Sequence, residues 1–237
     1  MAPVAGGLPK ELLPVGGKPL LQWTLEEAAA AGLERAVIVT SPDKPHIAEF
    51  LSHQPHATSR LSVSLVVQPR PRGLGDALTC ARAITARDDI AVLLPDNLFS
   101  GGPAIAAVLD AFRRTGLSCV LIAEIPAAGT PGGGQGATGR ARCRPRSDGL
   151  WDVLAVAEKA PAEPSTLTPI GRWVFDATIF ERFERLRGRL AAGAELDDVP
   201  VLQELATEGR LVGVPLAGRF FDVGLPTGYR DALAALT

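Results

Sequence analysis

Two aspartates occupy positions at which the strands of a sheet could bring carboxylates together. Asp96 follows an apolar run and Pro95, and Asp222 follows Phe221 just before a turn that contains glycine and proline. Ligands of open α/β sheets bind outside the carboxyl ends of the strands. Two carboxylates in such a cleft suit Mg²⁺ when waters and substrate phosphates supply its other ligands. Aspartates are also common in turns, so the pattern predicts either a magnesium site or two ordinary turn residues.

A segment near the start of the chain combines glycines with a lysine. Gly6 and Gly7 precede Pro9 and Lys10 within residues 3–20. Glycines allow backbone N–H groups to approach phosphates closely, and a lysine is a flexible cation that can reach them. The segment is therefore a candidate phosphate-binding loop, although a glycine-rich loop alone has little specificity.

A charged pair, Glu158-Lys159, ends an apolar run of the chain. In a site, the carboxylate could accept hydrogen bonds from sugar hydroxyls while the ammonium group holds a phosphate. On the surface the same two residues would form a solvated charge pair. Both interpretations are open at this point.

Four arginines alternate along a predicted strand at positions 140, 142, 144 and 146. Alternate residues of a strand lie on the same face. The arginines therefore form either a solvated outer face or the mouth of a cleft that attracts an anionic substrate.

The elements that must position these residues alternate between short apolar runs and segments of helical period. This pattern is typical of a mainly parallel sheet covered by helices. Strands are expected at residues 36–40, 63–67, 90–94, 118–123, 139–143, 151–158, 171–175, 211–216 and 220–223. Helices are expected at residues 20–31, 74–84, 103–113, 178–187, 199–208 and 226–236. The strands that follow the glycine-rich break at 126–138 are expected to form a smaller antiparallel insertion.

The composition indicates a globular protein without a polyanionic partner. The 237 residues carry a formal net charge of −2, which argues against nucleic acid and against anionic membranes. Three widely spaced cysteines argue against a disulfide framework and against a zinc site. Neither a secretory signal nor a membrane-spanning run is visible, so a cytoplasmic protein is expected.

An ordered set of motifs covers nearly the whole chain. The set comprises Pro3-Val-Ala-Gly6, Pro9-Lys-Glu-Leu-Leu-Pro-Val15, Lys18-Pro19-Leu20, Gln68-Pro69, Gly73-Leu-Gly-Asp-Ala77, Leu94-Pro-Asp-Asn-Leu98, Glu158-Lys159, Ile170-Gly-Arg172, Phe221-Asp-Val-Gly224 and Gly228-Tyr229. In order and spacing these motifs resemble the sugar-1-phosphate nucleotidyltransferase family. The resemblance is nearest to its UTP:glucose-1-phosphate uridylyltransferase and dTTP:glucose-1-phosphate thymidylyltransferase branches.

The resemblance implies a Rossmann-like α/β fold of the nucleotide-diphospho-sugar transferase type. It also implies one domain over residues 1–237, with a nucleotide-binding half at about 1–125 and a sugar-binding half at about 126–237. In the implied reaction of nucleotide-sugar biosynthesis, a sugar 1-phosphate attacks the α-phosphorus of a nucleoside triphosphate and releases pyrophosphate. Family members commonly form homo-oligomers.

The resemblance also implies roles for individual residues. Catalysis would fall to Lys10, Asp96 and Asp222, and both aspartates would bind Mg²⁺. The nucleotide would contact Val4, Ala5, Gly6, Gln68 and Gly73, and the sugar phosphate would contact Gly139, Glu158, Lys159 and Gly171. Gln68 and Gly73 would recognise features that uracil and thymine share, so UTP or dTTP is the favoured nucleotide.

The chain departs from the family in the loop that follows the first strand. The family's loop reads roughly Gly-x-Gly-Thr-x-Arg and is followed by a longer segment, whereas Gly6 and Gly7 here run almost directly into Pro9 and Lys10. One consequence would be that another cation takes the arginine's place, for which the candidates are Arg70, Arg72 and Arg172. The alternatives are a weakly active enzyme and a non-catalytic subunit that binds nucleotide or sugar phosphate as a scaffold.

Overall fold

The chain folds into two compact units. The computed structural model describes residues 7–53, 61–85, 88–125, 139–157, 165–191 and 193–236. The first unit comprises Met1–Pro71, Leu94–Pro103 and Gly218–Thr237, and the second comprises Arg72–Leu93 and Ala104–Ala217. Each unit therefore draws on stretches that are far apart in the sequence. The expected single domain with halves that meet near residue 125 stays a prediction.

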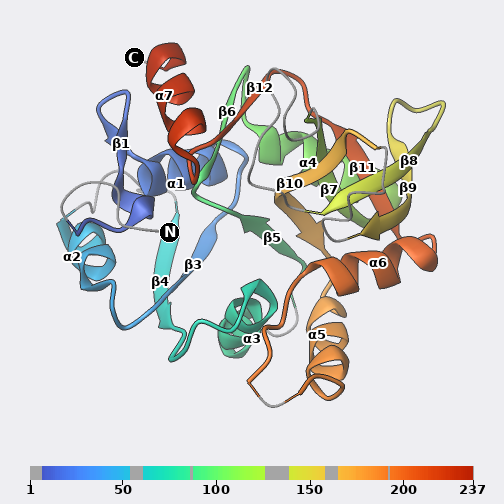
Figure 1. Cartoon of the computed structure of the whole chain (residues 1–237), viewed down its shortest axis with the longest axis horizontal. Helices are drawn as coiled ribbons and strands as arrows, with labels where there is room; N and C mark the ends of the chain where they lie inside the picture. The colour runs from blue at the N-terminus through green and yellow to red at the C-terminus, as the bar shows by residue number, and fades with distance from the viewer. Residues whose placement is uncertain are drawn as a thin grey trace. The chain divides into compact units, whose positions relative to one another are not determined.

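The first unit contains three small two-stranded sheets and three helices among its described residues (Figure 1). Its sheets pair β1 (Pro14–Val15) with β2 (Lys18–Pro19), β3 (Arg35–Thr40) with β4 (Ser62–Val67), and β6 (Asn97–Ser100) with β12 (Arg219–Asp222). Its helices are α1 (Leu20–Ala30), α2 (Pro45–His53) and α7 (Pro226–Ala235), and a single 3₁₀ turn covers Lys10–Leu12. Only the β3–β4 pair is parallel among these sheets.

A tight hairpin follows the 3₁₀ turn of the first unit. Gly16 and Gly17 connect β1 to β2 with φ values of 56° and 78°. Two consecutive positive φ values suit the two-residue turns of hairpins, which glycine adopts without strain. Val15 and Leu20 beside this turn are fully buried, and they share a core cluster with Leu98 of β6. The hairpin therefore fixes the segment that contains Lys10 to the core of its unit.

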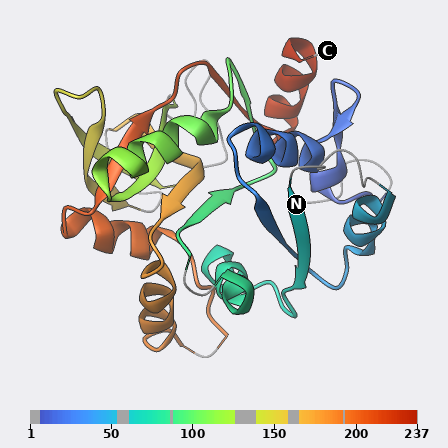
Figure 2. The same ribbon diagram turned by 180° about the vertical axis from the view of Figure 1, so that it is seen from behind.

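The second unit contains a six-stranded sheet with the strand order β5-β10-β7-β11-β9-β8. Its strands are β5 (Ile90–Leu93), β7 (Ser118–Glu124), β8 (Arg140–Pro145), β9 (Trp151–Ala157), β10 (Leu167–Phe175) and β11 (Leu211–Pro215). Its helices are α3 (Leu74–Thr85), α4 (Ala104–Thr115), α5 (Ile179–Arg187) and α6 (Val199–Thr207). Helix α4 packs on β7 and β10, and α6 packs on β9 (Figure 2).

The α/β fold class is confirmed, and the pairing of the strands is mixed. In the second unit β7 and β11 run parallel, whereas β10 runs antiparallel to both β5 and β7. Strand β10 begins at Leu167, earlier than the predicted residue 171. Pro169 lies within this strand, although proline is uncommon inside strands because it cannot donate a backbone hydrogen bond. A shift of register between Ile170 and Trp173 accommodates this part of the strand.

Most of the other predicted elements lie close to their expected positions. The helix predicted at 74–84 is α3, and the strand predicted at 118–123 is β7. The hairpin β1–β2 and strand β6 were not predicted, because runs of two and four residues carry too little periodicity. No helix of the described residues is long and apolar enough to cross a membrane.

Candidate functional site

The pairing of β6 with β12 brings Asp96 and Asp222 together. Asp96 immediately precedes β6, and Asp222 is the last residue of β12, opposite Asn97. The backbone N–H of Val223 donates to the carbonyl oxygen of Asp96 at 2.8 Å. Antiparallel pairing therefore places the two aspartates side by side, although 126 positions separate Asp96 from Asp222 in the sequence.

Hydrophobic residues on both faces hold this strand pair in register. Leu98 is paired with Phe221, and both are buried in the core cluster of the first unit. On the other face, the rings of Phe99 and Phe220 lie with their centroids 5.7 Å apart. Cross-strand pairs of this kind stabilise a sheet and specify its register. A slip of one residue would expose Leu98 and Phe221 and would separate the aspartates.

Gly224 leaves the space between the two carboxylates open. A Cβ atom at this position would lie 3.0 Å from Oδ1 of Asp222 and 3.3 Å from Oδ2 of Asp96. Both oxygens therefore lie within 3.3 Å of one point in space. The N–H of Gly224 also donates to Oδ1 of Asp222 at 3.1 Å, so the glycine orients one carboxylate as well as making room for both.

Lys10 provides the positive charge at this pair. Its Nζ donates to Oδ2 of Asp96 at 2.5 Å. Burial alone would lower the pKa of Lys10, but the attraction of Asp96, Glu11 and Asp222 outweighs this effect and raises its pKa above the ordinary value. Lys10 therefore stays protonated at neutral pH. Its ammonium group offsets part of the negative charge of the two carboxylates.

Asp222 is held in an environment that disfavours its ionised form. Burial is the largest cause of the raised pKa of Asp222, and repulsion from Asp96 adds to it. The N–H of Gly224 and the charge of Lys10 oppose the shift without cancelling it. A divalent cation between the carboxylates would remove this repulsion, so the site has an electrostatic reason to bind one.

The donors at this site fit Mg²⁺ better than a transition metal. Among the described residues, no group of three or more His, Cys, Asp and Glu side chains could hold a metal ion. Mg²⁺ is commonly bound through one or two carboxylates, with waters and substrate phosphates completing its coordination. The open space at Gly224, flanked by two carboxylate oxygens, is consistent with this type of ligation.

A pocket of about 730 Å³ adjoins Lys10 in the first unit. Its lining residues are Gly7, Leu8, Pro9, Lys10, Leu13, Asp43, Lys44, Val223, Gly224, Leu225, Pro226, Tyr229 and Arg230. Lys44 and Arg230 were not among the site residues predicted from the sequence. Lys44 follows β3 in a strand-end loop, so the strand-end rule could have found it. Arg230 lies inside a helix and has no comparable signal.

Gln68 and Gly73 are the described residues among those predicted to contact the nucleotide. Gln68 directly follows β4, and its N–H donates to Thr40 at the end of β3 at 2.7 Å. Gly73 belongs to the second unit and has a φ of 90°. A Cβ at Gly73 would lie 2.6 Å from the carbonyl oxygen of Leu196, so only glycine fits there. The predicted contacts Val4, Ala5 and Gly6 lie outside the described residues.

Two of the predicted sugar-phosphate residues lie in the sheet of the second unit. Gly139 precedes β8, and a Cβ there would lie 2.7 Å from the carbonyl oxygen of Ala157 at the end of β9. Gly139 therefore lies beside the strand that leads to Glu158. Gly171 is buried within β10. Glu158 and Lys159 themselves lie outside the described residues.

Arg172 does not fit the role of a replacement cation. It is fully buried in the second unit, and its guanidinium donates to the carbonyl of Gly171 at 2.7 Å. A side chain in this environment serves the interior of its sheet and is not accessible to a phosphate. Arg70 and Arg72 are exposed, but neither lines the pocket beside Lys10.

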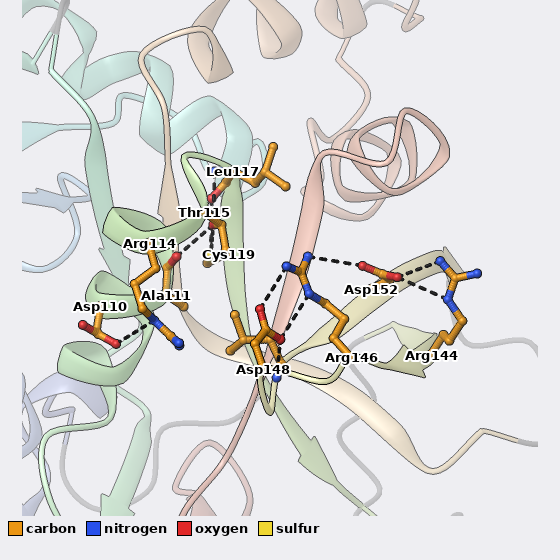
Figure 3. Close-up of polar contacts among 11 residues, drawn as sticks. Asp110, Ala111, Arg114, Thr115, Leu117, Cys119, Arg144, Arg146, Asp148 and Asp152 are labelled. Atoms are coloured by element: carbon orange, nitrogen blue, oxygen red, sulfur yellow. Dashed lines mark hydrogen bonds and ion pairs between the residues drawn. The ribbon is translucent and has the colours of Figure 1, made fainter.

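The alternating arginines of β8 are engaged in structural contacts. Arg140 donates to the carbonyls of Ile125 and Thr166 at 2.7 and 3.1 Å. At the other end of the strand, Arg144 and Arg146 form ion pairs with Asp152, and Arg146 also pairs with Asp148 (Figure 3). For Arg144 and Arg146 the interpretation as an outer face is consistent with these contacts, because neighbouring carboxylates already offset their charges.

A comparison with known protein families shows to which family the chain is related. The family described as nucleotidyl transferase matches residues 1–237. The chain belongs to the nucleotidyl transferase family. This assignment and the relatives below confirm the resemblance to sugar-1-phosphate nucleotidyltransferases that the ordered motifs indicated.

Relatives match the chain over nearly its whole length. A UTP–glucose-1-phosphate uridylyltransferase of Bacillus subtilis (strain 168) is 28% identical over 96% of this chain and 83% of its own. The enzyme of the same name from Haemophilus ducreyi is 28% identical over 98% of this chain and 87% of its own. A crystal structure of UDP-glucose pyrophosphorylase complexed with UDP-glucose matches with a TM-score of 0.83 and 25% identity, over 96% of this chain and 89% of its own.

Proposed function

We propose that the chain transfers a uridylyl group from UTP to a sugar 1-phosphate, with glucose 1-phosphate as the first candidate. The observation that carries the proposal is the constellation of Asp96, Asp222 and Lys10 around the open space at Gly224. The names of the relatives support UTP and glucose 1-phosphate as substrates. The features of Gln68 and Gly73 do not separate uracil from thymine, so dTTP is the second nucleotide to test.

In the proposed reaction, an oxygen of the sugar phosphate forms a bond to the α-phosphorus of UTP. The bond from that phosphorus to the bridging oxygen breaks, and pyrophosphate leaves with the electron pair. Mg²⁺, when bound at Asp96 and Asp222, would draw the two phosphates together and offset their charge. The protein contributes little covalent chemistry, because most of the rate comes from positioning and from neutralising charge.

In the proposed reaction, Lys10 would leave Asp96 and bind the triphosphate. A metal ion and the ammonium group would compete for Oδ2 of Asp96, which Lys10 now holds at 2.5 Å. Once the carboxylate binds a cation, the ammonium is available to the triphosphate. Lys10 needs no raised pKa for this purpose, because its ordinary value of 10.5 already keeps it protonated at neutral pH. Lys10 would then stabilise the negative charge that develops on the leaving pyrophosphate.

The other predicted residues complete the proposed substrate sites. Val4, Ala5, Gly6, Gln68 and Gly73 would contact the nucleotide, and Gly139, Glu158, Lys159 and Gly171 would contact the sugar phosphate. A Cβ at Gly73 or Gly139 would meet backbone atoms of Leu196 or Ala157, so packing within the second unit explains both glycines, and their proposed ligand contacts rest on the resemblance alone.

A second candidate function is a non-catalytic subunit that binds nucleotide or sugar phosphate. The short segment from Gly7 to Lys10 favours it, because this segment has no arginine for the triphosphate. Retention of Lys10, Asp96 and Asp222 in one constellation favours catalysis.

The two functions are separated by an assay of pyrophosphate release with Mg²⁺. Five nucleoside triphosphates are combined with a panel of sugar 1-phosphates, and Asp96→Asn serves as the blank. Asp110→Asn is the matched control, because Asp110 is an exposed carboxylate of α4 in the second unit. Turnover with UTP and glucose 1-phosphate above the blank would support the proposal. A folded protein without turnover for any combination would support the non-catalytic subunit.

A further inference from the structure

The pocket beside Lys10 is lined by three cationic side chains and one carboxylate. The cations are Lys10, Lys44 and Arg230, and the carboxylate is Asp43. A hydrogen bond from Ser41 lowers the pKa of Asp43, so this carboxylate is ionised at neutral pH. The lining as a whole is positive. It therefore suits an anion, provided that more than one cation reaches the ligand to outweigh Asp43.

Two of the three cations already have partners. Lys10 donates to Asp96 at 2.5 Å, and Lys44 donates to Glu11 at 2.9 Å. The side chain of Glu11 is only 16% exposed, so its charge is one that Lys44 must compensate. Neither lysine can turn fully toward a ligand unless its carboxylate gains another partner. A polyphosphate therefore needs a further positive group in this pocket.

Arg230 is such a group. It is exposed on α7, and no hydrogen bond or ion pair joins it to another described residue. The helix that carries it is tied to the carboxylate site, because the N–H of Leu225 donates to the carbonyl of Asp222 at 3.0 Å. The preceding residue in the helix, Tyr229, donates from its hydroxyl to the carbonyl of Pro14 at 2.9 Å. The backbone at Arg230 is therefore fixed while its guanidinium is available.

We propose that Arg230 binds the terminal phosphates of the nucleoside triphosphate in this pocket. This inference rests on the proposed function and adds a residue to it. A guanidinium presents parallel N–H donors that fit two phosphate oxygens at once. Arg230 thereby supplies the arginine that the short segment from Gly7 to Pro9 lacks, from a helix at the other end of the chain.

The test measures polyphosphate binding separately from turnover. Calorimetry with Mg²⁺ and inorganic tripolyphosphate compares the wild type with Arg230→Gln and Arg230→Lys. Arg113→Gln is the matched control, because Arg113 is also an exposed helical arginine without a partner among the described residues. Steady-state kinetics then give the KM for UTP and for the sugar 1-phosphate. Circular dichroism and thermal unfolding confirm that each variant folds.

We expect Arg230→Gln to weaken tripolyphosphate binding roughly tenfold to a hundredfold, as the loss of a charge-assisted contact implies. The KM for UTP should rise while the KM for the sugar 1-phosphate stays within about twofold, and Arg230→Lys should recover part of the affinity. Equal affinity of the wild type and Arg230→Gln, or no binding by the wild type, would overturn the proposal. Arg230-dependent binding without any turnover would contradict the proposed function and leave the phosphate pocket in place.

Discussion

Charged residues are treated differently in two regions of the molecule. On the hairpin of β8 and β9, Arg146 lies between Asp148 and Asp152, and Arg144 pairs with the other side of Asp152 (Figure 3). The hydrogen bond from Arg146 lowers the pKa of Asp148, so its ionised form is favoured. At Asp96 and Asp222 in the first unit, two carboxylates share one cation, and the pKa of Asp222 is raised.

The two regions differ in whether each charge has an opposite charge as its neighbour. In the group formed by Arg144, Arg146, Asp148 and Asp152 on the hairpin, each charge has an opposite neighbour at the surface. Asp222 has a negative neighbour and is partly buried, so its ionised form is disfavoured even with the positive charge of Lys10 nearby. Clusters of like charge in partly buried positions are typical of functional sites. The comparison therefore singles out the first region without reference to any relative.

The largest expected effect comes from Asp222→Asn. We expect turnover to fall by roughly 10²- to 10³-fold or more, because the site loses half of its carboxylate ligands for the cation. The melting temperature should stay equal or rise, since the variant removes the repulsion that raises the pKa of Asp222. Steady-state kinetics and calorimetric unfolding test both statements, with Asp110→Asn as the control. Unchanged turnover, or a large loss of stability, would mean that Asp222 serves the structure, as the charges of the hairpin do.

Gly224→Ala tests the proposed cation site, because it fills the space between the carboxylates of Asp96 and Asp222. The new methyl group would lie 3.0 Å from Asp222 and 3.3 Å from Asp96, so both side chains must move. We expect the Mg²⁺ concentration for half-maximal rate to rise roughly tenfold to a hundredfold, as for other losses of ligand orientation. Gly188→Ala is the control, because a Cβ there makes only ordinary contacts at 3.6 and 3.7 Å. An unaltered Mg²⁺ dependence would mean that the cation binds elsewhere.

Several elements of the fold could be predicted from the sequence. The pairing of β6 with β12, which brings Asp96 and Asp222 together, could not. Strand β7 and helix α3 were predicted because their apolar residues repeat with a clear period. Strand β6 has four residues, and its partner β12 lies more than 100 positions later in the chain. Short strands carry weak periodicity, and a single sequence contains no record of which strands pair. From the sequence, the strand-end positions of Asp96 and Asp222 suggested a shared cleft and the resemblance implied one, but neither gave the pairing of β6 with β12.

Arg230 illustrates a second limit of sequence reasoning. Phosphate-binding cations are sought in glycine-rich loops and after strands, because these positions expose backbone N–H groups and side chains to a cleft. Arg230 is one of several arginines on helices, and its helical position resembles that of Arg113. Its place in the pocket depends on how α7 follows β12, which only the structure shows.

Asp198 provides a second carboxyl with a raised pKa, this time in the second unit. It precedes α6 in the second unit, where burial and a hydrogen bond with Asp197 raise its pKa to about 8. The unfolded chain ionises this carboxyl near its ordinary pKa of 3.8, whereas the folded chain keeps it protonated up to about pH 8. Stability contributed by Asp198 is therefore present below pH 3.8 and is lost progressively as the pH rises to about 8.

We therefore expect Asp198→Asn to melt a few degrees higher than the wild type at pH 8 and nearly equally at pH 4. Thermal unfolding across this pH range measures the difference. Asp110→Asn is the control, because Asp110 is an exposed carboxylate of α4 that does not contribute to the shift at Asp198. A difference that does not change with pH would show that Asp198 is ionised in the folded chain.

The smallest expected effect is that of Arg146→Gln on the hairpin of β8 and β9. Its ion pairs with Asp148 and Asp152 lie at the surface, where such pairs contribute little because water and salt screen them. We expect the melting temperature to fall by about 2 °C or less, and turnover to stay unchanged. The part of this difference that comes from Asp148 should disappear as the pH falls through its lowered pKa, because a protonated carboxyl no longer attracts the guanidinium. A large loss of turnover in this variant would assign the hairpin to the substrate site, and the distinction between satisfied and unsatisfied charges would then fail as a guide to function.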